Sequence, residues 1–256
     1  MSAASSNPEE NESGGMRFAI LIPNYNHKES IARLLDELAE YRLPCVIVND
    51  GSDEETCRVL EEQSRLRDWV TIVNRCKRGG KGAAVMQGLL HLQRAGFTHA
   101  IQLDADGQHN PTDAARFLKE AINDPGALIL GKPKFGADVP KSRLVGRQLS
   151  RVLVWAETLS FAIADPLLGY RIYPLQATVR VFNNSRVGLG MDFDPEIAVR
   201  LYWAGVPVRN VQTRVIYPNK GLSHFRMVKD NALMVWLHLR LLLSGLCRVR
   251  LLLRKV

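Results

Sequence analysis

The sequence predicts an α/β fold built on a mostly parallel sheet, because short apolar runs alternate with longer amphipathic segments. In this 256-residue chain, apolar runs of strand length recur from residue 17 onward. Segments with apolar residues at helical spacing separate them, as in 81–94, where Val85, Leu89 and Leu92 share one face. We expect strands at 17–23, 45–48, 70–73, 99–103 and 127–130, and helices at 29–41, 54–65, 81–94 and 112–122.

The sequence divides into three segments. Residues 1–15 are rich in Ser, Glu, Gly and Asn, and we expect them to form a disordered tail. They contain no basic stretch followed by an apolar one, so they give no indication of a secretory signal. No Pro/Gly/Ser-rich linker interrupts residues 16–220, so we expect one domain over 16–227. Residues 228–256 are predicted to form a basic amphipathic helix.

Charge and cysteine usage narrow the function classes. The formal net charge is +8, but six of the Lys and Arg residues lie within 229–256, which leaves the preceding domain only mildly basic. This distribution disfavours a nucleic-acid enzyme and favours a phosphorylated substrate or a lipid surface as the anionic partner. The four cysteines form no CxxC pair, which is typical of reduced thiols in a cytoplasmic protein.

Polar residues follow each of the first four expected strands, in loops 24–26, 49–52, 74–81 and 104–106. In open α/β sheets, ligands bind outside the carboxyl ends of the strands, where loops and helix N-termini meet. We therefore expect these four loops to line one rim of the sheet and to form the substrate site.

Two of these loops suit a nucleoside diphosphate sugar. The carboxylate of Asp50 can accept hydrogen bonds from ribose hydroxyls or a nucleobase, although 50–53 is also an ordinary turn and helix cap. Loop 78–82 combines flexible glycines with the charge of Lys81, which suits a diphosphate, although a solvated glycine-rich loop has the same composition. The GxxxxGK[ST] spacing is absent, which disfavours a P-loop NTPase.

Two groups of carboxylates are candidates for chemistry. Asp104 and Asp106 flank the small Ala105 after an apolar strand, so both carboxylates can face one cation that also binds diphosphate oxygens. Such a triplet also arises by chance, but its position at a strand end, directly before the turn at 107–111, strengthens its interpretation as a metal site. Residues 192–196 place three carboxylates at the start of a helix expected to run to about residue 204, where they either complement the helix dipole or supply a general base.

Taken in order, these motifs resemble family 2 glycosyltransferases of the GT-A fold, and most of all the dolichol- and polyprenol-phosphate sugar synthases. The resemblance covers residues 17 to about 226. It rests on Ile-Pro-Asn-Tyr-Asn (22–26), Asn-Asp-Gly-Ser (49–52), Gly-Lys-Gly-Ala-Ala (80–84) with Gly88, Asp-Ala-Asp-Gly-Gln-His-Asn-Pro (104–111), Pro140 with Arg143, Asp165 with Gly-Tyr-Arg (169–171), Phe-Asp-Pro-Glu (193–196) and Gly-Leu-Ser (221–223).

The resemblance implies an inverting transfer from a UDP- or GDP-linked sugar, assisted by Mg or Mn. It implies that the metal lies at Asp104 and Asp106. Asp106 is expected to be the direct ligand, and Asp104 is expected either to contact the ribose or to support the metal site without binding the metal directly. If the acceptor is a hydroxyl, Asp194 is the expected base and Glu196 the second choice, whereas a lipid phosphate needs no strong base. The nucleotide sugar is expected at Pro23, Tyr25, Asn26, Asp50, Lys81, Asp104, Ala105 and Asp106, and phosphate oxygens or the acceptor at Arg171, Ser223 and His224.

The sequence departs from the family pattern at two places. Asn49 stands where the family usually has the first of two aspartates, which puts the nucleoside contacts there in doubt. Gly-Lys-Pro (131–133) replaces the more usual Gly-x-Arg, so a further phosphate contact is uncertain. No pair of membrane-spanning segments follows the matched region.

The apolar stretch 232–247 is shorter than a membrane span needs and has His238 and Arg240 near its middle. On one continuous helix, Arg240 and the other basic residues of 229–255 fall on one side. We expect this helix to lie in an anionic membrane interface, the alternative being a helix packed on the domain with its basic edge in water. The arc predicted to face lipid comprises Met234, Val235, Leu239, Leu242, Leu246, Val249 and Leu253.

Together these observations predict a metal-dependent hexosyltransferase that acts on a lipid, lipid-phosphate or membrane-proximal acceptor. We expect it to be cytoplasmic, peripheral on the inner face of a membrane, and without a nucleic-acid partner. A nucleotidyltransferase is the rival enzyme, but its glycine-rich loop should follow the first strand, where 24–26 reads Asn-Tyr-Asn. A catalytically inert nucleotide-binding protein at the membrane is the third reading, and the intact acidic and basic loops argue against it.

Overall fold

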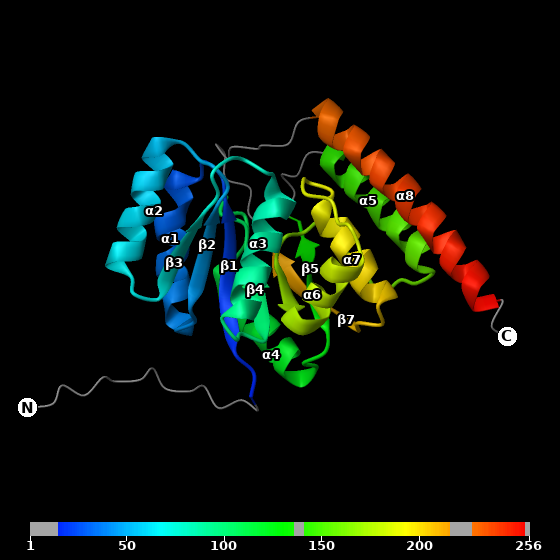
Figure 1. Cartoon of the computed structure of the whole chain (residues 1–256), viewed down its shortest axis with the longest axis horizontal. Helices are drawn as coiled ribbons and strands as arrows, with labels where there is room; N and C mark the ends of the chain where they lie inside the picture. Colours follow the sequence, from blue (N-terminus) through cyan, green and yellow to red (C-terminus); the bar gives the residue numbers. More distant parts are fainter. Residues whose placement is uncertain (1–14, 136–140, 216–226, 254–256) are drawn as a thin grey trace, which may run out of the picture.

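A computed structural model describes residues 15–135, 141–215 and 227–253, with side chains in the last two segments described over 144–215 and 230–246. Its centre is a seven-stranded sheet in the order β3-β2-β1-β4-β6-β5-β7, covered by helices on both faces (Figure 1). Every pairing is parallel except those of β6, which runs antiparallel to both β4 and β5. The strands are β1 (Phe18–Asn24), β2 (Cys45–Asn49), β3 (Val70–Asn74), β4 (His99–Gln102), β5 (Leu128–Lys134), β6 (Arg171–Pro174) and β7 (Val208–Arg214).

Helices form a layer on each side of the sheet because the central strands alternate apolar side chains between two buried faces. Ile20 and Ile22 of β1 join a core with helices α1 and α4, whereas Leu21 joins a second core with α3, α7 and α8. The helices are α1 (Lys28–Leu38), α2 (Glu54–Leu66), α3 (Lys81–Arg94), α4 (Ala114–Asn123), α5 (Lys141–Thr158), α6 (Leu175–Asn184), α7 (Phe193–Trp203) and α8 (Met227–Leu253), with short 3₁₀ turns η1 (Ala39–Tyr41) and η2 (Pro111–Asp113).

All five expected strands and all four expected helices of the first half are present, with ends shifted by only a few residues. The predicted helices at 29–41 and 112–122 each include a 3₁₀ turn, η1 at the end of one and η2 at the start of the other. The antiparallel β6 was not predicted. It has only four residues, and it enters the middle of the sheet through pairing with β4, far away in sequence.

The C-terminal helix α8 runs alongside α5 in the same direction at one edge of the molecule (Figure 1). Leu237 and Leu241 are fully buried and join the core beneath them. Thus α8 is an integral layer of the domain over its described part. In the described residues, no helix combines the length and apolar character needed to cross a bilayer.

His99 supplies a pH-dependent contribution to the stability of this fold. Its ring stacks on Phe18 and contacts the Pro125 carbonyl oxygen at 2.8 Å. Burial lowers the pKa of His99 below its ordinary value of 6.5, despite the opposing effect of that carbonyl. The unfolded chain therefore takes up a proton first as the pH falls, and this contribution is lost below pH 6.5.

We predict that His99→Gln reduces the fall in unfolding free energy below pH 6.5, as measured by urea denaturation across a pH series. The comparison is the difference between variant and wild type at each pH, because other groups titrate in both proteins. An unchanged difference between pH 8 and pH 5 would contradict this role for His99.

Candidate active site

The rim at the carboxyl ends of the first strands is aligned by strand register. Asn24, Asn49 and Asn74 are neighbours at the ends of β1, β2 and β3, and the Asn49 side-chain amide donates to Asn74 Oδ1 at 2.9 Å. The loops that follow are also joined, because the backbone N–H of Asn26 donates to Ser52 Oγ. The structure therefore brings the first three of the expected loops together.

Asp50 organises this rim from within. Only 3% of Asp50 is exposed, and its carboxylate accepts hydrogen bonds from the backbone N–H groups of Gly79 and Gly80, each at 2.8 Å. Its Oδ1 also lies 2.8 Å from Nε of Arg75. Asp50 therefore holds the β3–α3 loop in place, and the nucleoside contact expected from the sequence stays a prediction.

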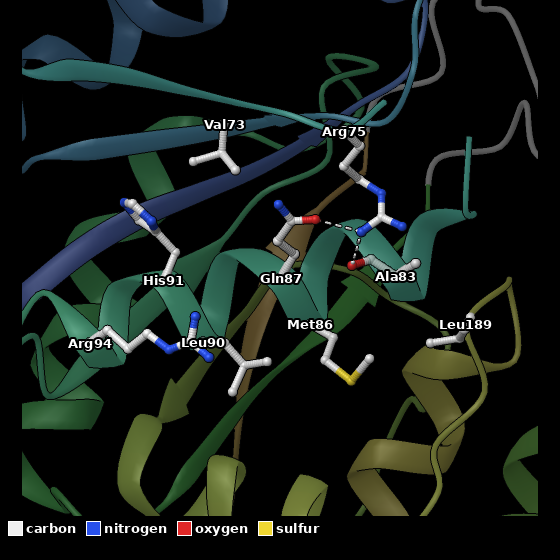
Figure 2. A pocket seen from close by; sticks show the side chains of 9 residues that line it. All are labelled: Val73, Arg75, Ala83, Met86, Gln87, Leu90, His91, Arg94 and Leu189. Carbon is white, nitrogen blue, oxygen red and sulfur yellow. Dashed lines mark hydrogen bonds between the residues drawn. The ribbon is translucent and has the colours of Figure 1, made fainter. Parts of the chain in front are cut away.

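Arg75 is a residue that sequence analysis missed, although a cation directly after a strand end was a usable signal. Its Nη1 donates to the Ala83 carbonyl oxygen at 3.2 Å and to Gln87 Oε1 at 2.6 Å (Figure 2). It also lines a cavity of about 280 Å³ beside α3, together with residues such as His91 and Arg94. Arg75 thus links the rim to the outer surface of α3.

Three backbone amides of loop 78–82, those of its glycines, donate to the protein itself. Besides the two amides that bind Asp50, Gly82 N donates to the Gly190 carbonyl at 3.2 Å and Ala83 N to the Leu189 carbonyl at 3.0 Å. The start of α3 is therefore closed by the 188–190 segment. Of the features expected there for a diphosphate, the side chain of Lys81 remains as the cationic contact.

Tyr25 and Asn26 have different local roles. The Arg78 guanidinium lies over the Tyr25 ring, 3.9 Å from its centroid, so it covers one face of an aromatic ring at the rim. Asn26 has a φ of 56° and its Oδ1 accepts from the backbone N–H of Asp53 at 2.8 Å, so it shapes the loop. Pro23, opposite Val48 in the sheet, is a buried residue of β1.

The centre of the candidate site is the ammonium group of Lys81. Its Nζ lies 2.9 Å from Asp104 Oδ2 and 2.8 Å from Asp194 Oδ2, and it is largely shielded from solvent. Asp104 follows β4, Lys81 begins α3 and Asp194 lies in the first turn of α7. Three elements distant in sequence therefore meet at one buried cation.

The charges in this cluster support one another. Burial alone would lower the pKa of Lys81, but Asp104 and Asp194 outweigh it and raise the pKa. Burial works against the Asp104 carboxylate, but Lys81 and then His109 hold the pKa of Asp104 well below its usual range. Lys81 and Asp104 therefore each favour the charged form of the other.

Gly169 leaves room for this cluster. A Cβ placed on Gly169 would lie 2.4 Å from Asp104 Oδ2 and 2.7 Å from Lys81 Nζ. Contacts this short are not tolerated, so any larger residue at 169 must displace the ion pair. The backbone at 169 therefore forms a wall of the site.

Arg171 is bound within the fold. Its side chain is fully buried and donates to the carbonyl oxygens of Pro166, Leu168 and Asp194 at 2.6 to 2.7 Å. Each of its three side-chain nitrogens thus donates to a backbone carbonyl group. These contacts disfavour the expected contact of Arg171 with phosphate oxygens or the acceptor, which stays a prediction.

Glu196 is likewise occupied within the fold. It is fully buried, and its Oε1 accepts from Nε of Arg200 at 2.8 Å while its Oε2 accepts from Gly188 N at 2.8 Å and from Arg240 at 2.6 Å. Four nitrogen contacts, including one from Nη2 of Arg200, leave no access for an acceptor. This geometry disfavours Glu196 as a general base.

The Asp104-Ala105-Asp106 turn divides its two carboxylates. Asp104 turns toward Lys81 and also lies 3.3 Å from Nε2 of His109. Asp106 Oδ1 accepts a hydrogen bond within the turn, from Gln108 N at 3.0 Å, and Asp106 forms no ion pair within the described residues. Ala105 is buried, and its carbonyl accepts from the Ser30 hydroxyl. Asp106 is therefore the more available oxygen donor.

The described residues include no cluster of three or more His, Cys, Asp or Glu side chains arranged to hold a metal ion. The donors on the turn are carboxylate oxygens, which Mg²⁺ and Mn²⁺ prefer. They fit a cation that takes its remaining ligands from substrate oxygens or water. Asp106 would hold such a cation, with Asp104 behind it.

His109 is a further residue to which sequence analysis assigned no role. It is buried, packs against the Tyr170 ring at 5.2 Å between centroids, and presents Nε2 to Asp104. Tyr170 in turn stacks on Phe117. The signal was available, because a histidine five residues after an acidic strand end can return to it through a turn. Ser223 and His224 lie outside the described residues.

With this geometry established, comparison with known proteins assigns the family. The model for "Glycosyl transferase family 2" matches residues 19–182. The chain is 26% identical over 226 residues to polyprenol monophosphomannose synthase of Mycolicibacterium smegmatis, covering 84% of this chain and 82% of the relative. It is 29% identical over 183 residues to UDP-N-acetylglucosamine--dolichyl-phosphate N-acetylglucosaminyltransferase of Methanococcus voltae, covering 65% and 69%.

Solved structures confirm the predicted fold. Glucosyl-3-phosphoglycerate synthase from Mycobacterium tuberculosis, in complex with Mn²⁺, UDP-glucose and phosphoglyceric acid, has a TM-score of 0.66 at 15% identity over 91% of this chain and 80% of that one. A mannosyltransferase from Pyrobaculum calidifontis with GDP-mannose and Mn²⁺ has a TM-score of 0.58 at 20% identity over 80% and 58%. The chain is a GT-A protein that belongs to glycosyl transferase family 2, and the relatives it resembles are polyprenyl- and dolichyl-phosphate sugar transferases.

Proposed function

We propose that this glycosyltransferase moves a sugar from a UDP- or GDP-linked donor to a polyprenyl-type lipid phosphate, with inversion at the anomeric carbon. The observation that carries the proposal is the buried Lys81 bridge between Asp104 and Asp194. A fixed ammonium at the rim of the sheet is a preorganised partner for the negative charge that develops on a departing diphosphate. The relatives named for polyprenyl and dolichyl phosphates support the acceptor class.

The donor would lie along the rim. Tyr25 offers an aromatic face beside Arg78 for the nucleobase, and Lys81 offers charge for the diphosphate. Because the glycine amides of loop 78–82 already donate to protein oxygens, side-chain charge, more than backbone N–H groups, would bind phosphate. Asp50 would contribute indirectly by holding that loop.

A divalent cation, Mg or Mn, would bind at Asp106 and supply Lewis-acid stabilisation of the leaving diphosphate. Asp104 would remain paired with Lys81 and serve as the second carboxylate of the site. This division follows from their contacts, because Asp104 is already bound to an ammonium and Asp106 is not. The two structural neighbours crystallised with nucleotide sugars also contain Mn²⁺.

The surroundings of Asp194 favour a phosphate acceptor over a hydroxyl. Its side chain is 5% exposed, and it lies 2.8 Å from Lys81 and 3.8 Å from Arg171. Its carboxylate is oriented toward two cations of the protein, so it serves better as a fixed counter-charge than as a base at the acceptor. An already ionised lipid phosphate needs no base, whereas a hydroxyl acceptor would. Such an acceptor would place the protein peripherally at a membrane, on its cytoplasmic face.

Donor use is tested by incubating the protein with a panel of nucleotide sugars and Mn²⁺, with and without polyprenyl phosphate. We predict release of UDP or GDP that increases with the acceptor and falls by at least about 100-fold in Asp106→Ala. Pyrophosphate release would identify a nucleotidyltransferase, and no release would favour an inert binding protein. Normal turnover in Asp106→Ala with an unchanged melting temperature would remove Asp106 from the metal site.

A second prediction concerns the wall at Gly169. Gly169→Ala should lower kcat/KM by on the order of 100-fold, because its methyl group displaces the Asp104–Lys81 pair. Gly126→Ala is the matched control, since a Cβ there meets nothing within 4 Å. Nucleoside diphosphate release and thermal melting should be measured for both variants. Equal activity of the two would show that the pair does not have to keep its position during turnover.

A further inference from the structure

Helix α5 exposes an apolar stripe to its surroundings. Val145, Leu149 and Val152 are 68%, 61% and 53% exposed, and they recur at the spacing of one helical face. Leu159 and Phe161, in the turn that follows, are 77% and 78% exposed and extend the stripe. A helix in contact with water normally presents polar residues on this face.

Helix α8 exposes a similar stripe beside the first. Val235, Trp236, Leu239, Leu243 and Leu246 are between 48% and 71% exposed. Since α8 lies along α5 and runs in the same direction (Figure 1), the two stripes belong to the same edge of the molecule. Ten of the thirteen exposed large apolar residues in the described part of the chain belong to these two helices and the turn after α5.

The ionisable residues in the described part of α8 contact the domain. His238 is buried with its Nδ1 2.7 Å from Oε1 of Glu157, and Arg240 donates to Oε2 of Glu196 at 2.6 Å. Asp230 is only 3% exposed. The described part of α8 thus directs Asp230 and His238 inward, holds Arg240 at the border of its exposed side with 34% of that side chain exposed, and places large apolar side chains outside.

Two arginines of α5 are likewise held by protein contacts. Arg147 turns to Asp165 at 2.5 Å, and the guanidinium of Arg151 lies over the ring of Trp155. The contacts of α8 also change the expectation for that helix. Arg240 was expected on a basic edge toward lipid headgroups, but it binds a buried carboxylate, and Met234 packs on the core instead of facing outward.

We propose that the exposed stripes of α5 and α8, which we call the α5–α8 face, dock together on the surface of an anionic lipid bilayer. Charge supports this partner, because the sequence places Lys229 before the α8 stripe and Arg248 and Arg250 after it. Trp236 and Phe161 are aromatic side chains of the kind that settle at a membrane interface. No described helix can cross a bilayer, so the face lies on the membrane.

The choice of lipid over a second copy of the chain rests on the proposed function, whose acceptor is a lipid phosphate. The contacts also connect the face to the site. Arg240 of α8 binds Glu196, which is two residues from Asp194 on α7. Docking through this face would therefore hold the helix that carries Asp194 close to the membrane surface.

The test is vesicle flotation with phosphatidylglycerol and phosphatidylcholine vesicles, without donor or acceptor. We expect the wild type to float with anionic vesicles and Leu149→Glu and Leu243→Glu each to lose roughly tenfold or more in partitioning. Leu66→Glu, which changes an equally exposed leucine on α2, is the matched control and should bind as the wild type does. Thermal melting of all four proteins verifies that each is folded.

Three outcomes would overturn the proposal. The first is equal flotation of all four proteins. The second is a wild type that binds no vesicles, and dimerisation in sedimentation that is lost in Leu243→Glu would then identify a second copy as the partner. Loss in Leu243→Glu with normal binding in Leu149→Glu would refute the two-helix face and leave α8 alone. Because flotation uses no nucleotide sugar, failure of the proposed transfer reaction would show in the release assay and not here.

Discussion

The bridge from Lys81 to Asp104 and Asp194 is the interaction on which the rest of the site depends. It joins the start of α3, the end of β4 and the first turn of α7, and all three groups lie largely out of contact with solvent. Buried charges are stable only when they are paired, and removing one partner leaves an uncompensated charge in an apolar setting. The bridge therefore fixes the mutual position of these elements even before a substrate binds.

The same principle recurs at the rim and at the back of the domain. Asp50 uses its buried carboxylate to hold the loop that begins α3, and Glu196 uses its own to join α7 to α8. Acidic residues at strand ends and helix starts are read from sequence as substrate contacts. In this fold several of them bind other parts of the protein instead, which leaves Lys81, Asp106 and the aromatic face of Tyr25 as the residues that our proposal assigns to the substrate.

The sequence predicted the first half of the fold because local patterns determine it. Residues such as Val85, Leu89 and Leu92 mark a helix without knowledge of the rest of the chain. The antiparallel β6 depends on pairing with distant strands, which periodicity does not record. The sequence also does not show which way a side chain points. The motif at 169–171 placed Arg171 near the site, but only the packing of the folded chain turns its guanidinium inward to three carbonyl groups.

The C-terminal helix shows why direction matters for function. A helical projection places Arg240 on the basic side of α8, and in water that side would face out. Two buried carboxylates, Glu157 and Glu196, reverse this preference because they need cationic or hydrogen-bonding partners inside the domain. With His238 turned inward, Trp236 and Leu243 lie on the exposed side of α8, next to Arg240, whose side chain is 34% exposed. The contacts of the two buried acids thus set the rotation of α8 about its axis, and with it the apolar edge that the protein exposes.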